Sequence, residues 1–431
     1  MGRNISDCPP APDIKPSERY PGSVARTYNI NVITPIFGGG TETGTNDPVT
    51  PIRPSSIRGH LRFWWRATRG ASFQLVKDLR VREGEIWGTT ESPSAVQIWV
   101  RITDEGEEES CATVAPGRSF SRFNEGYPSY VLFPFQGNVK EQTAPSKARK
   151  KLKFTVFQCY PTSLQMDVEA ATWAWVNFGG IGARPRRGCG ALQCSDFGPN
   201  SANGIEDWLK SAYQRFDLTT ERDERSWPTL SGALLTSREV RSPLQAWEDA
   251  VNLLREFRQG SVGRNPGPKQ NQPRRSRWPE ADSLRAITGK GDRRHEKSIT
   301  LPDPKKVPSF PRAEFGLPIV FHFKDAADSP NNCELYPKGK SRMSSPIILK
   351  PLGLKEGNKA VAIVLQLKTS PLQAVEVKKI DGPPDLTSFN IRRPDLAHYT
   401  NSPMAKRSDR GSAVEAFTRF VKEKGFKEIV P

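Results

Sequence analysis

The pattern of apolar and polar positions predicts a strand followed by a helix near the start of the chain. Residues 26–33 alternate between polar and apolar side chains and are rich in β-forming residues, which predicts a strand. A second apolar series, at i, i+4, i+7 and i+8, consists of Ile57, Leu61, Trp64 and Trp65. That spacing is one face of a helix. Because a serine hydroxyl can satisfy the free N–H groups of a first turn, Ser55 and Ser56 after Pro54 predict where this helix begins.

The same reasoning gives the elements that follow in the first half of the chain. Runs of β-forming residues predict strands at 94–102, 129–133, 153–159 and 191–194. Residues 147–151 lie between two of these strands and are interpreted as a basic hairpin loop. Apolar residues at helical spacing over 164–178 predict a helix that packs on the sheet. The resulting order, β-α-β-β-α-β, is the ferredoxin-like arrangement.

The second half of the chain also mixes helices and strands. A second domain is expected to begin near Leu230, and helices are predicted at 243–259, from 278 onward, and at 412–424. Strands are predicted at 317–323, 346–349 and 361–367. We therefore expect an α+β fold with a flexible arm at 1–25, one domain at 26–200, and a second at 228–431. The second domain would carry a basic loop at 260–277, which contains no acid.

Charge narrows the choice of partner. The 431 residues include 64 Lys+Arg and 47 Asp+Glu, a formal net charge of +17, which favours an anionic partner. The arginines lie beside aromatic residues and glycines, a composition that suits nucleic acid better than a membrane surface. No apolar run approaches the ~18 residues of a membrane span, and the proline-rich N-terminus has no signal-peptide core. We expect a cytoplasmic protein without a membrane partner.

The cysteines argue against a metal or a disulfide scaffold. The chain has six, all scattered and without a Cys-x-x-Cys pair. We interpret them as free buried thiols and predict no metal and no cofactor.

The most basic stretch is residues 53–69, with five arginines and no acid. Arg58, Arg62 and Arg66 share the helical period of the apolar face and form a stripe beside it. A basic stripe next to a helix N-terminus suits phosphate binding, although an ordinary amphipathic helix with solvated arginines has the same pattern. Trp64 and Trp65 are adjacent and cannot point in one direction, so one could stack a base while at least one belongs to the core.

Two glycine-rich segments accompany this helix. Gly38, Gly39 and Gly40 follow the first strand, and glycine permits a close approach of the backbone to a ligand. Residues 178–190 contain five glycines, Arg184, Arg186 and Arg187. This segment lacks Gly-Lys-Ser/Thr and follows a helix instead of opening one, so it is neither a P-loop nor a dinucleotide fingerprint. It is interpreted either as a phosphodiester cradle or as a connection with solvated arginines.

These motifs carry a family resemblance. The strand, the turn Thr-Pro-Ile-Phe-Gly-Gly-Gly at 34–40, and the helix ending in Arg-Phe-Trp-Trp-Arg resemble the RAMP superfamily of CRISPR proteins, and specifically the capping subunit of type III-B (Cmr) effector complexes. The glycine-rich loop resembles the second hallmark of that superfamily, which helps grip RNA. Further similar segments at 277–280, 315–318 and 342–347 extend the resemblance over roughly residues 26–367.

The resemblance implies two ferredoxin-like (RAMP/RRM-like βαββαβ) domains with insertions. It also implies a subunit that binds guide RNA and target RNA, caps the complex near the 3′ end of the guide in antiviral defence, and contacts other RAMP subunits. The expected RNA-binding residues are Gly38, Gly39, Gly40, Ser55, Ser56, Arg58, Arg62, Trp65, Arg66, Gly180, Gly182, Arg184, Arg186, Arg187, Arg275 and Arg277.

No catalytic residue is predicted. His60 could act as a general base on a 2′-hydroxyl, and the loop acids Glu42 and Asp47 correspond in place to a cleaving aspartate of RAMP backbone subunits. None of these three residues has a recognisable catalytic neighbourhood in the sequence, and Asp47 before Pro48 is typical of a turn. The alternatives are a metal-independent RAMP endoribonuclease that processes guide precursors, and a basic assembly protein whose arginines meet acidic partner subunits.

Overall fold

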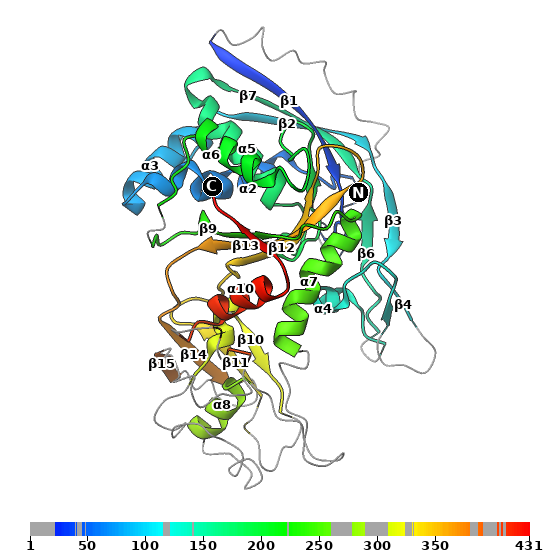
Figure 1. Cartoon of the computed structure of the whole chain (residues 1–431), viewed down its shortest axis with the longest axis vertical. Helices are drawn as coiled ribbons and strands as arrows, with labels where there is room; N and C mark the ends of the chain where they lie inside the picture. The colour runs from blue at the N-terminus through cyan, green and yellow to red at the C-terminus, as the bar shows by residue number, and fades with distance from the viewer. Residues whose placement is uncertain are drawn as a thin grey trace. The chain divides into compact units, whose positions relative to one another are not determined.

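A computed structural model of the chain (Figure 1) confirms the α+β class. The residues that it describes are 22–38, 40, 45–47, 49–114, 121–139, 142–221, 224–259, 278–288, 309–323, 330, 332–379, 387–390, 403–404, 407 and 411–431. The expected arm at 1–25 lies almost entirely outside these residues, and the basic loop at 260–277 lies wholly outside them.

The first sheet has the order β2-β7-β1-β8, and every neighbouring pair is antiparallel. Its strands are β1 (Ser23–Val32), β2 (Gln97–Asp104), β7 (Lys153–Pro161) and β8 (Leu192–Gln193). Helices α2 (Pro54–Ala67) and α5 (Gln165–Phe178) lie side by side on the sheet (Figure 1). Alternate β1 residues, Tyr28, Ile30 and Val32, are buried in the core that these helices share. The strands and helices predicted at these places are confirmed.

Some predictions in this half of the chain were wrong. Residues 129–133, predicted as a strand, form helix α4 (Ser129–Leu132) and enter the 3-10 turn Phe133–Phe135. Pro128 precedes this segment and Pro134 follows it, and a proline cannot donate a hydrogen bond to a neighbouring strand. The predicted loop at 147–151 is instead largely strand β6 (Lys147–Lys150), which pairs with β3 (Glu107–Ser110).

Several short elements complete this half. Helices α3 (Val76–Trp87) and α6 (Ile205–Arg215) were not predicted. A small hairpin pairs β4 (Ala112–Thr113) with β5 (Arg122–Phe123).

The second sheet has the order β12-β13-β9-β16. Its strands are β9 (Thr229–Thr236), β12 (Ile347–Gly353), β13 (Ala360–Lys368) and β16 (Lys427–Ile429). Every residue of β12 is buried, which explains why the sequence of this strand is nearly continuous in apolar residues. Helices α7 (Pro243–Gln259) and α10 (Ala413–Glu423) occupy the places predicted for them.

A third sheet has the order β10-β11-β14-β15 and is accompanied by α8 (Glu280–Thr288). Its strands are β10 (Ile319–Phe321), β11 (Cys333–Pro337), β14 (Ala374–Lys379) and β15 (Thr387–Asn390). Leu284 of α8 packs in one core with Leu335 and Val375 of this sheet.

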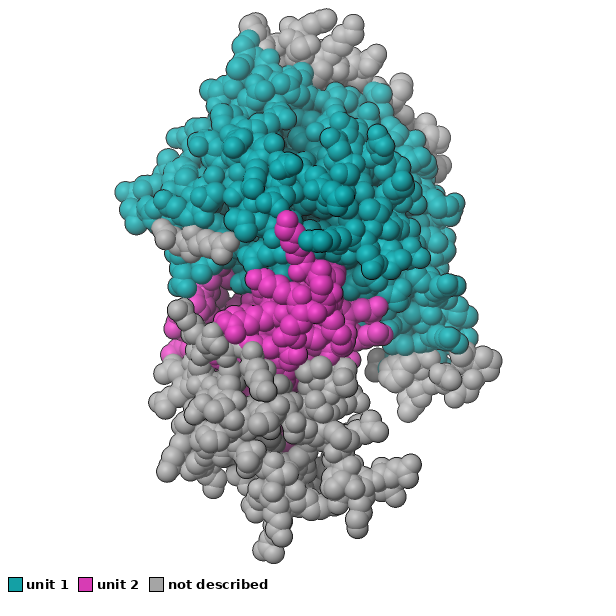
Figure 2. All heavy atoms as spheres, in the orientation of Figure 1, with its two compact units in different colours: residues 1–251, 348–368, 428–431 teal, residues 252–347, 369–427 magenta. Residues whose placement is uncertain are grey.

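The chain forms two compact units, coloured separately in Figure 2. Unit 1 comprises residues 1–251, 348–368 and 428–431, and unit 2 comprises 252–347 and 369–427. Unit 1 therefore contains the first and second sheets. The domain limits at 26–200 and 228–431 stay a prediction.

Candidate nucleic-acid interface

Most arginines of residues 53–69 already have acidic partners. The Nε of Arg62 lies 2.8 Å from Glu83, and the Nη1 of Arg66 lies 2.9 Å from the same carboxylate. Arg53 is paired with Asp47, and Arg69 pairs with Asp217 at 2.9 Å. The sequence around α2 lacks acids, but α3 and two loops supply them from elsewhere in the chain.

Arg58 differs from these four arginines. It has no ion pair among the residues that the structure describes, and its Nε–H group is buried without a hydrogen-bond partner there. An unsatisfied buried donor is costly, and a charged one more so. Of the predicted stripe, Arg58 is thus the member best placed to accept an anionic ligand.

The predicted serine cap of α2 was wrong. Arg53 occupies the N-cap position, but its side chain makes no capping hydrogen bond to the helix, and Pro54 is the first helical residue, where its missing N–H does no harm. Ser55 and Ser56 are exposed in the first turn, which contains no acid. This end of the helix therefore keeps its positive dipole end uncompensated within the turn.

Asp47 closes the turn before α2, as predicted from Asp-Pro. Its carboxylate accepts from the backbone N–H groups of Val49 and Thr50, both at 2.9 Å. Together with Arg53, these donors hold the pKa of Asp47 well below its usual range. A carboxylate held in this way is a turn residue and a poor general base.

Trp65 lies in the core and presents no ring face to a base. It is fully buried, and its Nε1 donates to Asp167 at 2.7 Å. Trp64 is 3 % exposed and packs against Phe178. Neither tryptophan is included in the interface proposed below.

The glycine turn (residues 34–40) and the glycine-rich loop (residues 178–190) are joined by hydrogen bonds. Ala183 N–H donates to the Phe37 carbonyl at 2.7 Å, and Gly190 N–H donates to the Pro35 carbonyl at 2.9 Å. At Gly182 φ is +75°, and a Cβ would lie 2.7 Å from Ile36 and 2.8 Å from the Phe37 carbonyl. Glycine is required there because the two segments pack closely.

Gly38, Gly40 and Gly180, the other described glycines predicted for the site, also lie close to protein atoms. A Cβ at Gly180 would lie 2.9 Å from the Gly190 carbonyl, and one at Gly38 would lie 3.3 Å from Ala183. Gly40 N–H donates to Thr45 at 2.9 Å. The structure thus gives these glycines a packing role, and their contact with RNA stays a prediction.

The arginines of the loop lie against aromatic rings. The guanidinium of Arg184 is 5.9 Å from the centroid of Phe133, which is 65 % exposed. The guanidinium of Arg186 is 5.2 Å from the centroid of Phe63 on α2, so the loop reaches the predicted RNA-binding helix. Burial lowers the pKa of Arg184, and it lowers that of Arg186 to about 10. The Nε–H of Arg184 is buried and has no hydrogen-bond partner in the described part of the chain.

Arg187 contributes through its backbone. Its carbonyl accepts from the Nε1 of Trp247 at 2.6 Å, while Gly188 packs against the same ring. This contact fixes the end of the loop.

His60 lies on α2 near the loop. Its ring stacks on Trp175 at 6.3 Å with an interplanar angle of 12°, and burial lowers its pKa. Within the described ranges, no group of three His, Cys, Asp or Glu residues is placed to hold a metal ion.

A buried lysine was missed by sequence reasoning. Lys350 of β12 is fully buried, and its Nζ donates to the Gly179 carbonyl at 2.8 Å and to the Val176 carbonyl at 3.4 Å. These carbonyls end α5, where a cation is favourable. Burial lowers the pKa of Lys350 to about 7. Nothing in the apolar run around Lys350 indicates this contact.

Other predicted residues are outside the described part of the chain. These are Gly39, Glu42, Arg275 and Arg277. Of the helices in the described ranges, none combines the length and apolar character that crossing a bilayer requires.

Comparisons with known proteins agree with the resemblance. Residues 29–193 match the RAMP superfamily. The chain is 26 % identical over 182 residues to the CRISPR system Cmr subunit Cmr1-2 of Pyrococcus furiosus, covering 38 % of this chain and 92 % of that one. It is 25 % identical over 217 residues to Cmr1-1 of the same organism, covering 46 % of this chain and 61 % of that one. The predicted resemblance to RAMP proteins and to Cmr subunits is confirmed.

Two solved structures are also similar. The crystal structure of apo Cmr1 from Pyrococcus furiosus aligns with a TM-score of 0.49 at 16 % identity, covering 94 % of this chain and 98 % of that one. A chain of a type III-B Cmr-beta complex bound to cognate target RNA aligns with a TM-score of 0.45 at 12 % identity, covering 93 % and 100 %.

Proposed function

We propose that this chain, a homologue of Cmr1 subunits, is a non-catalytic RNA-binding component of a type III-B CRISPR ribonucleoprotein. It would engage guide and target RNA, cap the complex near the 3′ end of the guide, and contact other RAMP subunits in cytoplasmic antiviral defence. The homology supports membership of a Cmr assembly. The RAMP match covers the glycine turn, α2 and the glycine-rich loop, which are the elements assigned here to RNA.

The observation that carries the proposal is a pair of arginines, Arg58 and Arg184, that have no acidic partner among the described residues and are partly withdrawn from water. Arg58 and Arg184 each bury an Nε–H group that has no hydrogen-bond partner among the described residues. Burial disfavours the charged forms of Arg184 and Arg186, as their lowered pKa values indicate. A phosphodiester oxygen would accept hydrogen bonds from the Nε–H groups of Arg58 and Arg184 and neutralise their charge, so bound RNA would supply partners that these two groups lack among the described residues.

Strand order supports a ferredoxin-like architecture for both halves of the protein. Numbered within the β-α-β-β-α-β series, the first sheet runs 2-3-1-4 as β2-β7-β1-β8. The series β9, α7, β12, β13, α10 and β16 gives the same order in the second sheet. On this proposal, the third sheet and α8 belong to insertions in the second repeat.

The test measures RNA affinity across a salt series. Fluorescence anisotropy with single-stranded RNA would compare the full chain with Arg58→Gln and Arg184→Gln. Each lost phosphate contact should lower the steepness of log affinity against log salt by about 0.7. Arg238→Gln removes an exposed arginine outside the proposed interface and is the matched control. Equal slopes for all four proteins would contradict the proposal.

The same samples test the nuclease alternative. His60 has a lowered pKa and would be largely neutral near pH 7, as a general base must be. We expect the RNA to remain intact on a denaturing gel. Cleavage in EDTA that is lost in His60→Ala would replace the binding proposal with guide processing.

A further inference from the structure

A second group of arginines lies at the opposite end of the α2–α5 pair. It comprises Arg26 of β1, Arg69 after α2, Arg82 of α3 and Arg215 of α6, here called the arginine quartet. His60 and Trp175 mark the glycine-loop end of the two helices, whereas Trp65 and Asp167 meet near the other end. Each helix has 14 residues, so the two ends are about 20 Å apart.

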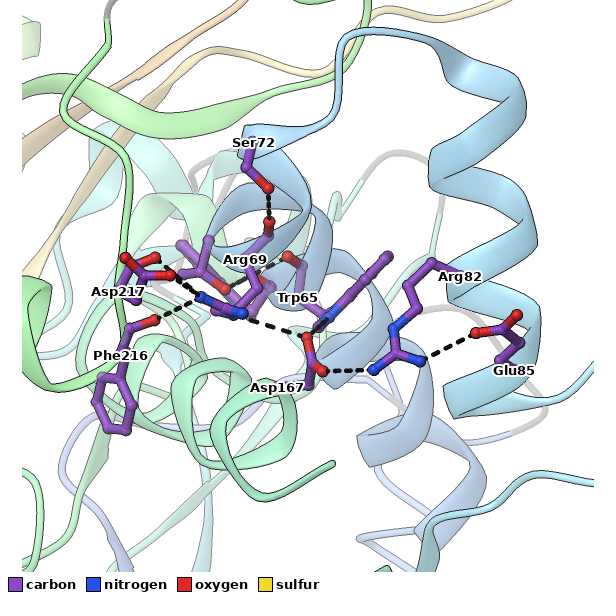
Figure 3. A network of polar contacts seen from close by, with 10 residues as sticks. Trp65, Arg69, Ser72, Arg82, Glu85, Asp167, Phe216 and Asp217 are labelled. Carbon is purple, nitrogen blue, oxygen red and sulfur yellow. Dashed lines mark hydrogen bonds and ion pairs between the residues drawn. The ribbon is translucent and has the colours of Figure 1, made fainter. Parts of the chain in front are cut away.

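Two buried carboxylates orient the quartet. Figure 3 shows Arg69 and Arg82 approaching Asp167 from two sides; their nearest atoms lie 3.8 Å and 3.1 Å from it. Glu169 accepts from the Nε of Arg26 at 3.0 Å and from the Nη2 of Arg215 at 2.8 Å. Asp167 is 7 % exposed and Glu169 is 3 % exposed. Guanidinium groups held in this way lose little conformational freedom when they bind an anion.

Two adjoining hollows open beside these side chains. One, of about 480 Å³, is lined by Arg26, Arg215, Lys355 and neighbouring residues. The other, of about 500 Å³, is lined by Arg69, Arg82 and Arg215 and by residues at the start of α5. Arg215 and Glu169 line both. The positive end of the α5 dipole therefore adds to the field of the arginines.

The lining is cationic even after its acids are counted. Five cations, the quartet and Lys355, face three carboxylates, those of Asp167, Glu169 and Asp196, a difference of 5 − 3 = +2. Glu85 and Asp217 pair with Arg82 and Arg69 at the rim, where they are 56 % and 84 % exposed and are screened by water.

Donors remain available in the hollows. The Nε and Nη1 of Arg215 and the Nζ of Lys355 have no partner among the residues described here. Hollows of this size admit phosphate groups, and the fork geometry of arginine fits phosphate oxygens.

We propose that this pair of hollows binds phosphate groups of RNA and extends the contact made at the other end of α2 and α5. That the phosphates belong to RNA rests on the proposed function, whereas the preference for phosphate rests on the hollows alone. An acidic segment of a partner subunit is the competing occupant. RNA is favoured because the cationic side chains line concave hollows of a size that suits small anionic groups such as phosphates. The basic interface proposed above also lies on the same pair of helices.

The experiment compares two RNA lengths. The full chain and an Arg215→Gln/Lys355→Gln variant would be titrated with single-stranded RNA of about 6 and about 25 nucleotides, across a salt series. Glu169 keeps Arg26, Tyr160 and Gln165 as partners in this variant. Lys210→Gln is the control, because Lys210 is an exposed cation on the same α6 helix that lines neither hollow.

With the longer RNA, the variant should lose about 1.4 from the salt slope, two contacts at about 0.7 each, and Lys210→Gln should lose nothing. With the short RNA, wild type and variant should agree. A long-RNA slope equal to that of wild type overturns the inference. The proposed function survives that result if Arg58→Gln and Arg184→Gln still flatten the slope.

Further arms separate the sources of the phosphate and the rival occupant. RNAs with a 5′-phosphate and with a 5′-hydroxyl end show which phosphate is bound. A terminal phosphate in the hollows makes wild type bind the two RNAs with different affinities, whereas internal phosphodiesters give equal affinities. Either result supports the inference if the Arg215→Gln/Lys355→Gln variant binds the RNA more weakly than wild type. Unchanged RNA binding with weaker co-purification of partner subunits assigns the hollows to protein and overturns it. Equal thermal melting of variant and wild type shows that folding is intact.

Discussion

At the scale of single residues, the arginines of α2 differ in what they already bind. Arg62 and Arg66 share the buried carboxylate of Glu83, whereas Arg58 has no ion pair in the described residues. The sequence pattern placed all three in one stripe. Periodicity assigns residues to a face, but the acid that pairs with two of them comes from α3, which the sequence did not predict.

The first prediction separates stability from RNA binding. Arg62→Gln/Arg66→Gln would leave Glu83 buried without a cationic partner, and we expect a loss of about 2 kcal/mol in the free energy of unfolding. This is below the 3–5 kcal/mol of fully buried pairs, because both arginines are about a third exposed. Arg58→Gln removes a buried donor that has no partner among the described residues, so it should not lower stability. Urea denaturation measures both; the reverse ranking would contradict the assignment of roles.

Lys350 gives a prediction about pH. Burial lowers its pKa from 10.5 to about 7, so between these values the unfolded chain binds more protons at this site than the folded chain. The free energy of unfolding should therefore rise with pH across that window, by up to about 1.4 kcal/mol per unit. Below pH 7 Lys350 is protonated in both the folded and the unfolded state, and the full cost of burying its charge lowers the free energy of unfolding.

The measurement is the difference between wild type and Lys350→Met, because tyrosines and cysteines also titrate above pH 8. The stability of Lys350→Met relative to wild type should be greatest below pH 7 and decrease toward pH 10. Parallel pH profiles from urea denaturation would show that Lys350 does not titrate in this window. Lys359→Met, an exposed lysine beside the second sheet, is the matched control.

At the scale of elements, the sequence predicted what periodicity and glycine spacing encode. The βαββαβ series of the first sheet, α7 and two strands of the second sheet, β12 and β13, were found, whereas β9 and β16 were not predicted as strands. Local propensity failed at 129–133, where the flanking Pro128 and Pro134 disfavour a strand and the backbone turns into a helix; just beyond it, Phe135 stacks on Phe37 with centroids 4.6 Å apart. That tertiary contact with a residue about 100 positions away cannot be seen in a local window.

The candidate site was predictable only in part for a related reason. Sequence reasoning found the glycine-rich segments and their arginines, and the structure joins them through Phe37, Ala183 and Gly190. It could not assign the acids that neutralise α2, nor Phe133 beside Arg184, because these residues come from other elements.

The junction of these two segments supports a prediction at Gly182. An alanine there would adopt a positive φ and place its Cβ 2.8 Å from the backbone of Phe37. We expect Gly182→Ala to lower the free energy of unfolding by about 1–3 kcal/mol and to weaken RNA binding, because the loop must shift. Urea denaturation and RNA titration measure the two effects.

The control is Gly59→Ala in the middle of α2, where a Cβ meets nothing within 4 Å. Higher helix propensity should make that variant more stable by up to about 1 kcal/mol. If Gly182→Ala behaved like Gly59→Ala, the close packing of loop and turn would be disproved.

At the scale of the whole molecule, unit 1 is assembled from distant parts of the chain. Residues 348–368 supply β13, which pairs with β9 from Ile363 opposite Thr236 to Lys368 opposite Thr229. The same segment supplies Lys350 to the end of α5 and backbone acceptors for Gln193. A linear reading places domain limits along the chain, whereas these contacts link the glycine-rich loop to a strand about 170 residues later.

The last prediction follows from this connection. A fragment of residues 1–251 contains the RAMP-matched region but lacks β12, β13 and β16, so Leu234 and Leu235 of β9 lose their cover and β9 loses both of its neighbouring strands. We expect it to lack the near-ultraviolet circular dichroism and cooperative urea transition of the full chain, although it keeps helical signal. Co-expression of residues 252–431 as a separate chain should restore both, because it returns the missing strands. A fragment that unfolded cooperatively alone would show that the first sheet and its helices are a self-sufficient domain, and that the glycine-rich loop needs no support from β12.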